Sequence, residues 1–365
     1  MALTSKLTNI ADAIREKTGS TDALTLDAMA EAIAGIESGG GASFPNGTNW
    51  TQTNFTNTGL NGLNFVTYAD GLWVASYNNG YIYTSDDGIV WQNKGDRFSV
   101  NVLCAYYSGG LFVAGTNGGL YYSTDGITWT QSNVTSGTAL KVVKANGLWV
   151  AATGSGLYYS TDGITWTQSN VTKSSYSRYI YYSSEAGVWV AADTYLCYST
   201  DGMTWTTTSK PKYVYCVRYG KGLFVLSCDS GLYYSTDCIT WTQSNVTSKG
   251  NYIHYADGLW VASVINSGLW YSTDGMTWTQ SNFTSSTTAS SRSNLIYKAD
   301  GVWVASIEGT GNGVYYSTDG MTWTKSNLAF STDYGACNYL GHEKGVWVIA
   351  GPVIGVQYSP TWQPA

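Results

Sequence analysis

The stretch Gly119–Thr138, "GLYYSTDGITWTQSNVTSGT", is repeated almost unchanged in this chain. Closely similar stretches begin at Gly156 ("GLYYSTDGITWTQSNVTKSS") and at Gly231 ("GLYYSTDCITWTQSNVTSKG"). Self-similarity at a fixed period is typical of an architecture assembled from equivalent units. The chain has 365 residues with 42 Gly, 30 Tyr and 16 Trp, so turn-forming and aromatic residues recur throughout.

Eight units can be counted from the aromatic residue of the recurrent "LWVA" motif. This residue recurs every 35 to 44 positions, at Trp73, Phe112, Trp149, Trp189, Phe224, Trp260, Trp303 and Trp347. Each unit has four short apolar runs; in the first they are "LNFVTYADG", "LWVASYN", "GYIYTSDDG" and "IVWQNK". Period-2 alternation between Gly or Asp-Gly turns predicts four antiparallel strands, here called a, b, c and d. The sequence thus predicts an all-β fold, an eight-bladed β-propeller of four-stranded antiparallel blades, or seven blades if one unit is degenerate.

The two ends of the repeated region complement each other. The last unit has a, b and c runs, but its d run is reduced to "TWQPA" at the C-terminus. A spare d-like phrase, "NWTQTNFTN", begins at Asn49, before the first unit. Pairing this phrase with the last unit would close the ring and remove an open sheet edge. We therefore predict that the propeller comprises residues 49–365 and that its eighth blade contains both ends.

The phrase "YSTDGITW" marks the expected turn between strands c and d. It resembles the Asp-box, or BNR repeat, of sialidase-like propellers, Ser-x-Asp-x-Gly-x-Thr-Trp, although it is one residue shorter here. Asp-Gly supports a tight turn, and the Asp and Ser oxygens can accept unpaired backbone N–H groups. One carboxylate per turn is too few for calcium, so we predict no metal and a structural role for these Asp residues. They are Asp87, Asp125, Asp162, Asp201, Asp237, Asp274 and Asp319.

Composition argues against several classes of partner. Only 12% of residues are charged, against about 25% in typical proteins, and the net charge of −6 leaves no basic stripe for nucleic acid. The N-terminus lacks the apolar region of a signal peptide, and no apolar run is long enough to span a membrane. We expect a soluble protein made in a cytoplasm, with six free cysteines and no cofactor.

One face of the predicted ring is uniform and the other varies. The a–b and c–d turns barely change between units, whereas the b–c and d–a connections differ in length and composition. Variable loops on a rigid scaffold favour recognition, and strand a is expected to line the channel through Thr67, Tyr106, Val143, Ser183, Arg218, His254, Tyr297 and Gly341. The candidate ligand-binding residues are Tyr106, Tyr176, Arg178, Arg218, Tyr252, His254, Arg292 and Tyr297.

Catalysis is not predicted. Glycosidases generally need a pair of carboxylates, and the ring's glutamates, Glu185, Glu308 and Glu343, fall in different blades. His254 and His342 lack the spacing of a metal motif. The arginine phrase of sialidases is also missing. We therefore expect no catalytic residues and no enzyme.

Residues 1–38 predict a separate segment of two short amphipathic helices, and residues 39–48 a Gly-rich linker. Two such helices bury too little alone, so they should pack on a partner or in a homo-oligomer. The phrase "LTNIADAIREKTG" (Leu7–Gly19) and the later "AGI" resemble a segment of tail and baseplate proteins of phages of Gram-positive bacteria. This resemblance implies a virion protein that binds a bacterial surface glycan. The alternatives are a structural or decoration protein without a ligand and, less favoured, a glycan-cleaving enzyme.

Overall fold

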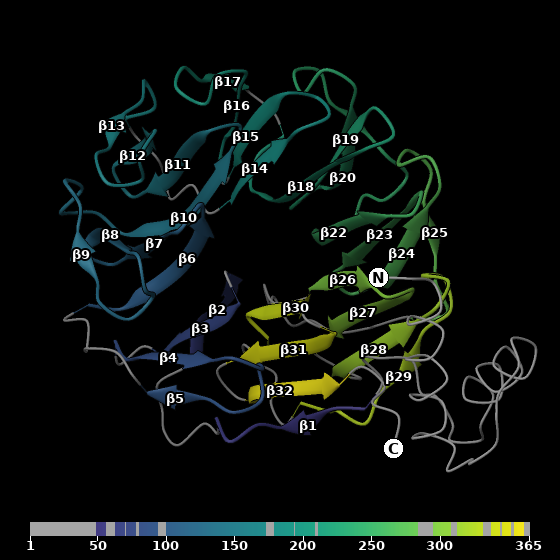
Figure 1. Ribbon diagram of the computed structural model, residues 1–365. Helices are drawn as coiled ribbons and strands as arrows, with labels where there is room; N and C mark the ends of the chain where they lie inside the picture. Colours follow the sequence, from purple (N-terminus) through teal and green to yellow (C-terminus); the bar gives the residue numbers. More distant parts are fainter. Residues whose placement is uncertain are drawn as a thin grey trace, which may run out of the picture. The chain divides into compact units, whose positions relative to one another are not determined.

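The computed structural model describes residues 49–55, 63–69, 71–77, 80–93, 100–172, 179–192, 194–208, 211–283, 295–307, 312–330, 337–343, 345–351 and 354–360. The chain divides into two units, residues 1–44 and 45–365, and every described residue belongs to the second. The predicted helices and linker of residues 1–48 lie outside this range. Within it, 32 strands form eight four-stranded antiparallel sheets and no helix occurs (Figure 1). The prediction of eight blades is confirmed.

Each blade follows the order a, b, c, d from the centre outward. The first four blades comprise β2 (Leu63–Ala69), β3 (Leu72–Tyr77), β4 (Ile82–Ser85) and β5 (Gln92–Asn93); β6 (Val102–Ser108), β7 (Leu111–Thr116), β8 (Gly119–Ser123) and β9 (Thr130–Gln131); β10 (Ala139–Ala145), β11 (Leu148–Thr153), β12 (Gly156–Ser160) and β13 (Thr167–Gln168); and β14 (Tyr179–Ser183), β15 (Val188–Ala192), β16 (Leu196–Ser199) and β17 (Thr206–Thr208).

The second half of the ring repeats this arrangement. Its blades comprise β18 (Val214–Gly220), β19 (Leu223–Cys228), β20 (Gly231–Ser235) and β21 (Thr242–Gln243); β22 (Gly250–Ala256), β23 (Leu259–Val264), β24 (Gly268–Ser272) and β25 (Thr279–Gln280); β26 (Ile296–Ala299), β27 (Val302–Ile307), β28 (Gly313–Ser317) and β29 (Thr324–Lys325); and β30 (Tyr339–Glu343), β31 (Val346–Gly351), β32 (Gly355–Pro360) and β1 (Thr51–Gln52).

The N-terminal end of the ring completes the last blade. β1 pairs antiparallel with β32, with Thr51 opposite Tyr358 and Gln52 opposite Gln357. The amide of Thr53 also donates to the carbonyl of Val356 at 3.1 Å. Two segments about 300 positions apart in the sequence therefore form one sheet, and the predicted closure is confirmed.

The hydrophobic core is divided among the blade junctions. Eight clusters of buried side chains occur, and each combines residues of two neighbouring blades. Between the third and fourth blades, for example, Leu148 and Val150 of β11 pack against Ile180 of β14 and Trp189 of β15. The first and last blades share such a cluster as well. Each blade is stable only against its neighbours, because both faces of its sheet are apolar.

The c–d turn is fixed by its own side chains. In the third blade, Oδ1 of Asp162 accepts the amides of Ile164 and Thr165 and the hydroxyl of Ser160, each at 2.8 Å. The Ser160 hydroxyl oxygen in turn accepts the amide of Gly163 at 2.8 Å. The corresponding Ser–Asp pair is hydrogen-bonded in the other six turns of this type. The turn thus satisfies backbone donors that neither strand c nor strand d can pair.

An asparagine links consecutive blades at their outer strands. Asn133, four residues after Trp129, donates from Nδ2 to the carbonyl of Trp166 at 2.9 Å and accepts the amide of Trp166 at 2.8 Å. The sequence analysis did not identify this role. The same two-way bond joins Asn54 to Trp91, Asn170 to Trp205, Asn245 to Trp278, Asn282 to Trp323 and Asn327 to Trp50.

Two junctions depart from this pattern. Four residues after Trp91 and Trp205 the sequence has Gly95 and Ser209, neither of which carries an amide side chain. The Trp residues that follow these junctions, Trp129 and Trp241, are partly exposed, whereas the six tryptophans bonded to an asparagine are at most 5% exposed. The bond between asparagine and backbone therefore accompanies close packing of the outer tryptophan.

We predict that Asn133→Ala lowers the free energy of unfolding by about 1 to 2 kcal/mol, because it removes both hydrogen bonds to the Trp166 backbone. Thr135→Ala, an exposed position in the same connection, is the control and should change stability little. Chemical denaturation of the full chain measures both variants. Equal stability of the two would contradict the role assigned to Asn133.

The c–d turns also predict how stability depends on pH. The pKa of all seven turn aspartates is lowered; for Asp162, Asp201, Asp237 and Asp274 the leading cause is an accepted backbone N–H group. A lowered pKa means that the unfolded chain binds more protons near pH 4, so the stabilisation is present above the ordinary value of 3.8 and is lost below it.

A variant with these four aspartates changed to Asn keeps an acceptor oxygen but no titrating group. Its melting temperature should therefore fall less steeply than that of the wild type between pH 5 and pH 2. Thermal melts across this range measure the slope. The same slope in both proteins would show that the turn carboxylates do not control acid stability.

Candidate functional site

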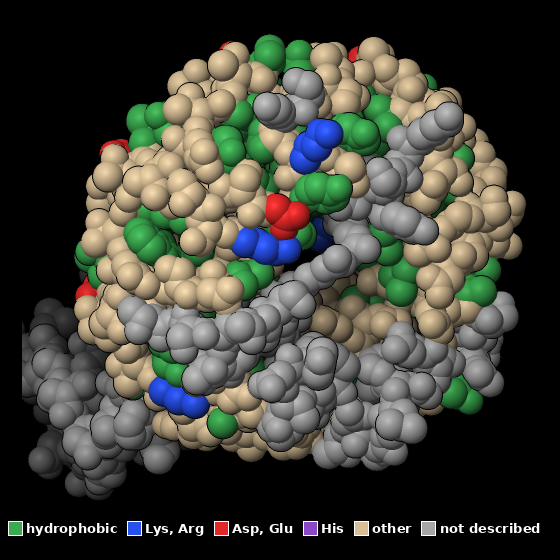
Figure 2. Space-filling view, turned by 180° about the vertical axis from the view of Figure 1, so that it is seen from behind, with side chains coloured by type: hydrophobic (Ala, Val, Ile, Leu, Met, Phe, Trp, Pro, Cys, Tyr) green, Lys and Arg blue, Asp and Glu red, His purple; other side chains and the backbone are tan. Residues whose placement is uncertain are grey.

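The centre of the ring holds a pocket with a volume of about 930 Å³. Its wall comes mainly from strand a of blades two to eight and from residues just before that strand. The structure describes 20 lining residues, and eight of them are tyrosines: Tyr106, Tyr179, Tyr181, Tyr182, Tyr213, Tyr215, Tyr252 and Tyr339. The charged residues in the described part of this lining are Lys141, Lys144 and Arg218, and no Asp or Glu occurs there. Figure 2 shows a face of the ring with a central hollow bordered by Lys or Arg, acidic and hydrophobic side chains.

Strand register decides which residues of strand a are equivalent. Arg218 lies opposite Val225, as Val143 lies opposite Val150 in the third blade. In the fourth blade the residue in this place is Tyr181, opposite Val190. Ser183, which the sequence analysis assigned to the channel, lies two positions further on and is buried, accepting the amide of Ala186 at 3.1 Å. The error arose because the turn after β14 is longer than in the other blades.

The predicted ligand-binding residues divide into three groups. Tyr106, Arg218 and Tyr252 line the pocket. His254 and Tyr297 do not border it; their rings lie 5.3 Å apart, and His254 also contacts Trp303 edge-on at 5.7 Å. The remaining three, Tyr176, Arg178 and Arg292, lie outside the described residues.

Arg218 is held at the centre of an aromatic cluster. Its Nη1 donates to the hydroxyl of Tyr179 and, at 3.0 Å, to the carbonyl of Val217, and its Nη2 donates to the hydroxyl of Tyr252 at 2.8 Å. The guanidinium carbon also lies 5.2, 5.6 and 5.7 Å from the ring centres of Tyr252, Tyr181 and Tyr179. Cation–π contacts and hydrogen bonds thus fix its position in the wall.

Lys141 is the second cation of the inner wall. It lies on β10, two residues before Val143, and is partly buried. Burial lowers the pKa of its ammonium group, and the positive charge of Arg218 lowers it further. No described carboxylate forms an ion pair with either cation; the described ion pairs join Lys249 to Asp229 and Lys298 to Asp257. His342 lies 3.1 Å from Asp300, but burial lowers the pKa of its imidazole.

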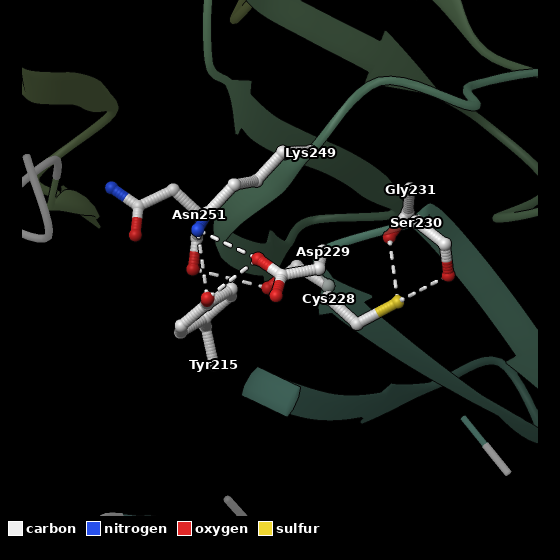
Figure 3. Close-up of polar contacts among 8 residues, drawn as sticks. Tyr215, Cys228, Asp229, Ser230, Gly231, Lys249 and Asn251 are labelled. Atoms are coloured by element: carbon white, nitrogen blue, oxygen red, sulfur yellow. Dashed lines mark hydrogen bonds and ion pairs between the residues drawn. The ribbon is translucent and has the colours of Figure 1, made fainter. Parts of the chain in front are cut away.

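A polar cluster at the start of β18 and β22 orients one tyrosine of the pocket (Figure 3). Lys249 Nζ lies 2.6 Å from Asp229 Oδ1 and donates to the Tyr215 hydroxyl at 2.8 Å. The Tyr215 hydroxyl donates to the same Asp229 oxygen at 2.7 Å. The sequence analysis missed this cluster, although Asp229 is an acid in one of the variable b–c connections.

Tyr213 stands out in backbone conformation. It precedes β18, lines the pocket and is 50% exposed, yet its φ is 55°, in the left-handed region that a bulky residue rarely adopts. Its amide donates to the carbonyl of Thr194, another lining residue, at 3.4 Å. A strained, exposed aromatic residue at a pocket is a recognised sign of a functional position.

The buried titratable groups of the inner wall are poor nucleophiles and bases. The pKa of His254 is lowered to about 3 by burial and by the nearby charges of Arg218 and Lys298, so the imidazole is neutral at physiological pH. Burial raises the pKa of Cys104 to about 11 and of Cys216 to about 12, and thiols in this state are unreactive. All six cysteines are free, as expected.

Among the described residues, no group of three or more His, Cys, Asp or Glu side chains is placed to hold a metal ion. No helix in that part of the chain is long and apolar enough to cross a membrane.

Comparisons with known proteins support the fold. Residues 38–136 match the DUF6242 β-propeller domain, and no curated protein matches the chain. The computationally designed protein Ika8 is similar with a TM-score of 0.64 at 10% identity, over 85% of this chain and 100% of its own. YCF48 bound to D1 peptide gives 0.53 at 15% identity, over 88% and 97%. The GH74 enzyme of Niastella koreensis gives 0.51 at 20% identity, over 79% of this chain and 48% of its own, so this chain spans about half its length. At these identities the likeness concerns the fold alone.

Proposed function

We propose that this propeller is a recognition protein without catalytic activity that binds a bacterial surface glycan in its central pocket. The observation that carries the proposal is the wall of that pocket, in which eight of the 20 described residues are tyrosines. A tyrosine offers an apolar ring face and a hydroxyl, and it loses little conformational entropy on binding. Sugars present C–H faces and hydroxyl groups, which match both properties.

The position of the pocket supports the same interpretation. Thr194 lies in a b–c connection, and Tyr213, Leu295 and Asn338 lie just before strand a of their blades. These are the connections that vary between the repeats, while the a–b and c–d turns are uniform. Variation is thus concentrated where a ligand would enter, as expected for loops that confer specificity.

The charges in the pocket favour binding over hydrolysis. A glycosidase of the usual type requires two carboxyl groups flanking the scissile bond, and the lining residues that the structure describes include neither Asp nor Glu. The GH74 enzyme that resembles this ring is only 20% identical to it, so the similarity concerns the fold and does not imply hydrolytic activity in this chain. A decoration protein without a ligand is the alternative, but it does not explain why an exposed tyrosine at position 213 is kept in a strained backbone conformation.

The location in a phage virion rests on residues 1–38. Their resemblance to tail and baseplate proteins implies that this segment attaches the protein to the tail while the ring binds the host.

Tyr213→Asn tests the pocket directly. Asparagine tolerates a positive φ, so the backbone should keep its conformation while the ring is lost. We expect the affinity of the full chain for cell-wall glycans of Gram-positive bacteria to fall about tenfold or more, with no fall in the melting temperature, because an aromatic anchor is worth about 2 kcal/mol.

Tyr195→Asn is the matched control. Tyr195 is 51% exposed in the b–c connection of the fourth blade but is not a lining residue of the pocket. Binding measured on a glycan array should be unaffected by this change. Equal loss in both variants, or no loss in Tyr213→Asn, would argue against the pocket as the glycan site. Absence of binding by the wild type to any glycan would favour the decoration protein.

A further inference from the structure

The central pocket carries positive charge inside a protein that is negative overall. The three charged residues in the described lining are all cations, whereas the whole chain has a net charge of −6. Two of them, Lys141 and Arg218, extend from blades three and five, on either side of the blade that provides Tyr179 and Tyr181. The neighbours that interact with Lys141 are Arg218 and the two protonated thiols, Cys104 and Cys216.

This arrangement is unfavourable in the empty pocket. Two like charges in a partly buried site repel each other, and each loses hydration without gaining an ion pair. The other cations of the ring with a described ion pair, Lys249 and Lys298, are each within 2.7 Å of an aspartate oxygen. Neither Lys141 nor Arg218 has such a partner among the described residues, so an anion from outside would remove the penalty.

Arg218 is also prepared to receive an anion. A guanidinium group has five N–H donors, and three of them are used by Tyr179, Val217 and Tyr252. No described residue accepts from Nε or from the second hydrogen of Nη2. Because the other three bonds hold the group rigidly, little conformational entropy remains to be lost when these two donors bind. Two donors on one planar group suit the paired oxygens of a carboxylate or phosphate.

We infer that Lys141 and Arg218 form a binding site for a carboxylate or phosphate group, and that the ligand of the central pocket is therefore an acidic glycan. The identification of the ligand as a glycan rests on the proposed function. The anion site itself is inferred from Lys141 and Arg218 alone. Arg218 binds two oxygens of the anion, Lys141 neutralises its remaining charge, and the surrounding tyrosines contact the attached sugar.

The anion site can be tested with inorganic phosphate as the probe. At constant ionic strength, exchanging chloride for phosphate should raise the melting temperature of the full wild-type chain in a saturable way. Lys141→Met and Arg218→Gln should abolish this rise. Lys325→Met, which removes an exposed cation of the outermost strand β29, should leave it intact.

Lys141→Met has a second expected effect. It replaces a partly buried, unpaired charge by an apolar side chain of similar length, so without phosphate the variant should melt at a higher temperature than the wild type. A higher melting temperature without phosphate would show that Lys141→Met is folded, so that its lack of a phosphate response reflects lost binding. The anion site would be refuted if phosphate raised the melting temperature equally in the wild type and the three variants. It would also be refuted if phosphate did not raise the melting temperature of the wild type.

Glycan binding by the wild type then identifies the source of the anion. Acidic glycans should bind about tenfold or more tightly than the same glycans after reduction of their carboxyl groups or removal of their phosphates, since hydrogen bonds to charged groups contribute about this factor. Equal binding of both forms, sensitive to Tyr213→Asn, would refute the acidic ligand but retain the proposed function. A phosphate effect that depends on Lys141, with no glycan bound, would retain the anion site and refute the glycan. Binding of acidic peptides in preference to glycans would refute the glycan likewise.

Discussion

The structure depends on apolar packing between neighbouring blades. Each of the eight hydrophobic clusters belongs to two blades, so no blade has a core of its own. A linear row of such sheets would expose one apolar face at each end. Closure removes both faces, which explains why a strand as short as β1 can complete the ring. Its two residues are supported by Trp50, which is buried between the seventh and eighth blades.

The blade junctions are nevertheless unequal. The second and fifth blades have Phe112 and Phe224 where the others have tryptophan, and they follow the two junctions without the asparagine link. Their outer tryptophans are correspondingly more exposed. Smaller aromatic residues, the lack of an asparagine side chain and greater exposure of the outer tryptophan thus coincide at the same two places. These junctions are the expected starting points for local opening of the ring, since local stability follows buried contacts and hydrogen bonds.

The scaffold and the pocket use different parts of the repeat. Strands b and c and the c–d turn are nearly identical between blades and supply the packing, while strand a and the connections before it vary. The pocket contains features that reduce stability, including the unpaired Lys141 and the positive φ of Tyr213. A ring with eight packed junctions can tolerate such costs, and proteins commonly accept them at functional positions.

The repeat pattern alone predicted eight blades, with seven as the alternative, together with their strand order, the turn hydrogen bonds and the closure by residues near Asn49. These features follow from alternation and turn chemistry within about 40 residues, and local patterns encode them directly. It did not determine that Ser183 is displaced from the channel in favour of Tyr181, because register depends on which residues pair across strands. It also could not bring Lys141, Tyr179, Arg218 and Tyr252 together. These residues come from four different blades, and only the curvature of the closed ring, set by packing between sheets, makes them neighbours. The asparagine links could not be predicted from the sequence for the same reason, since the tryptophan that each asparagine bonds lies in the next repeat.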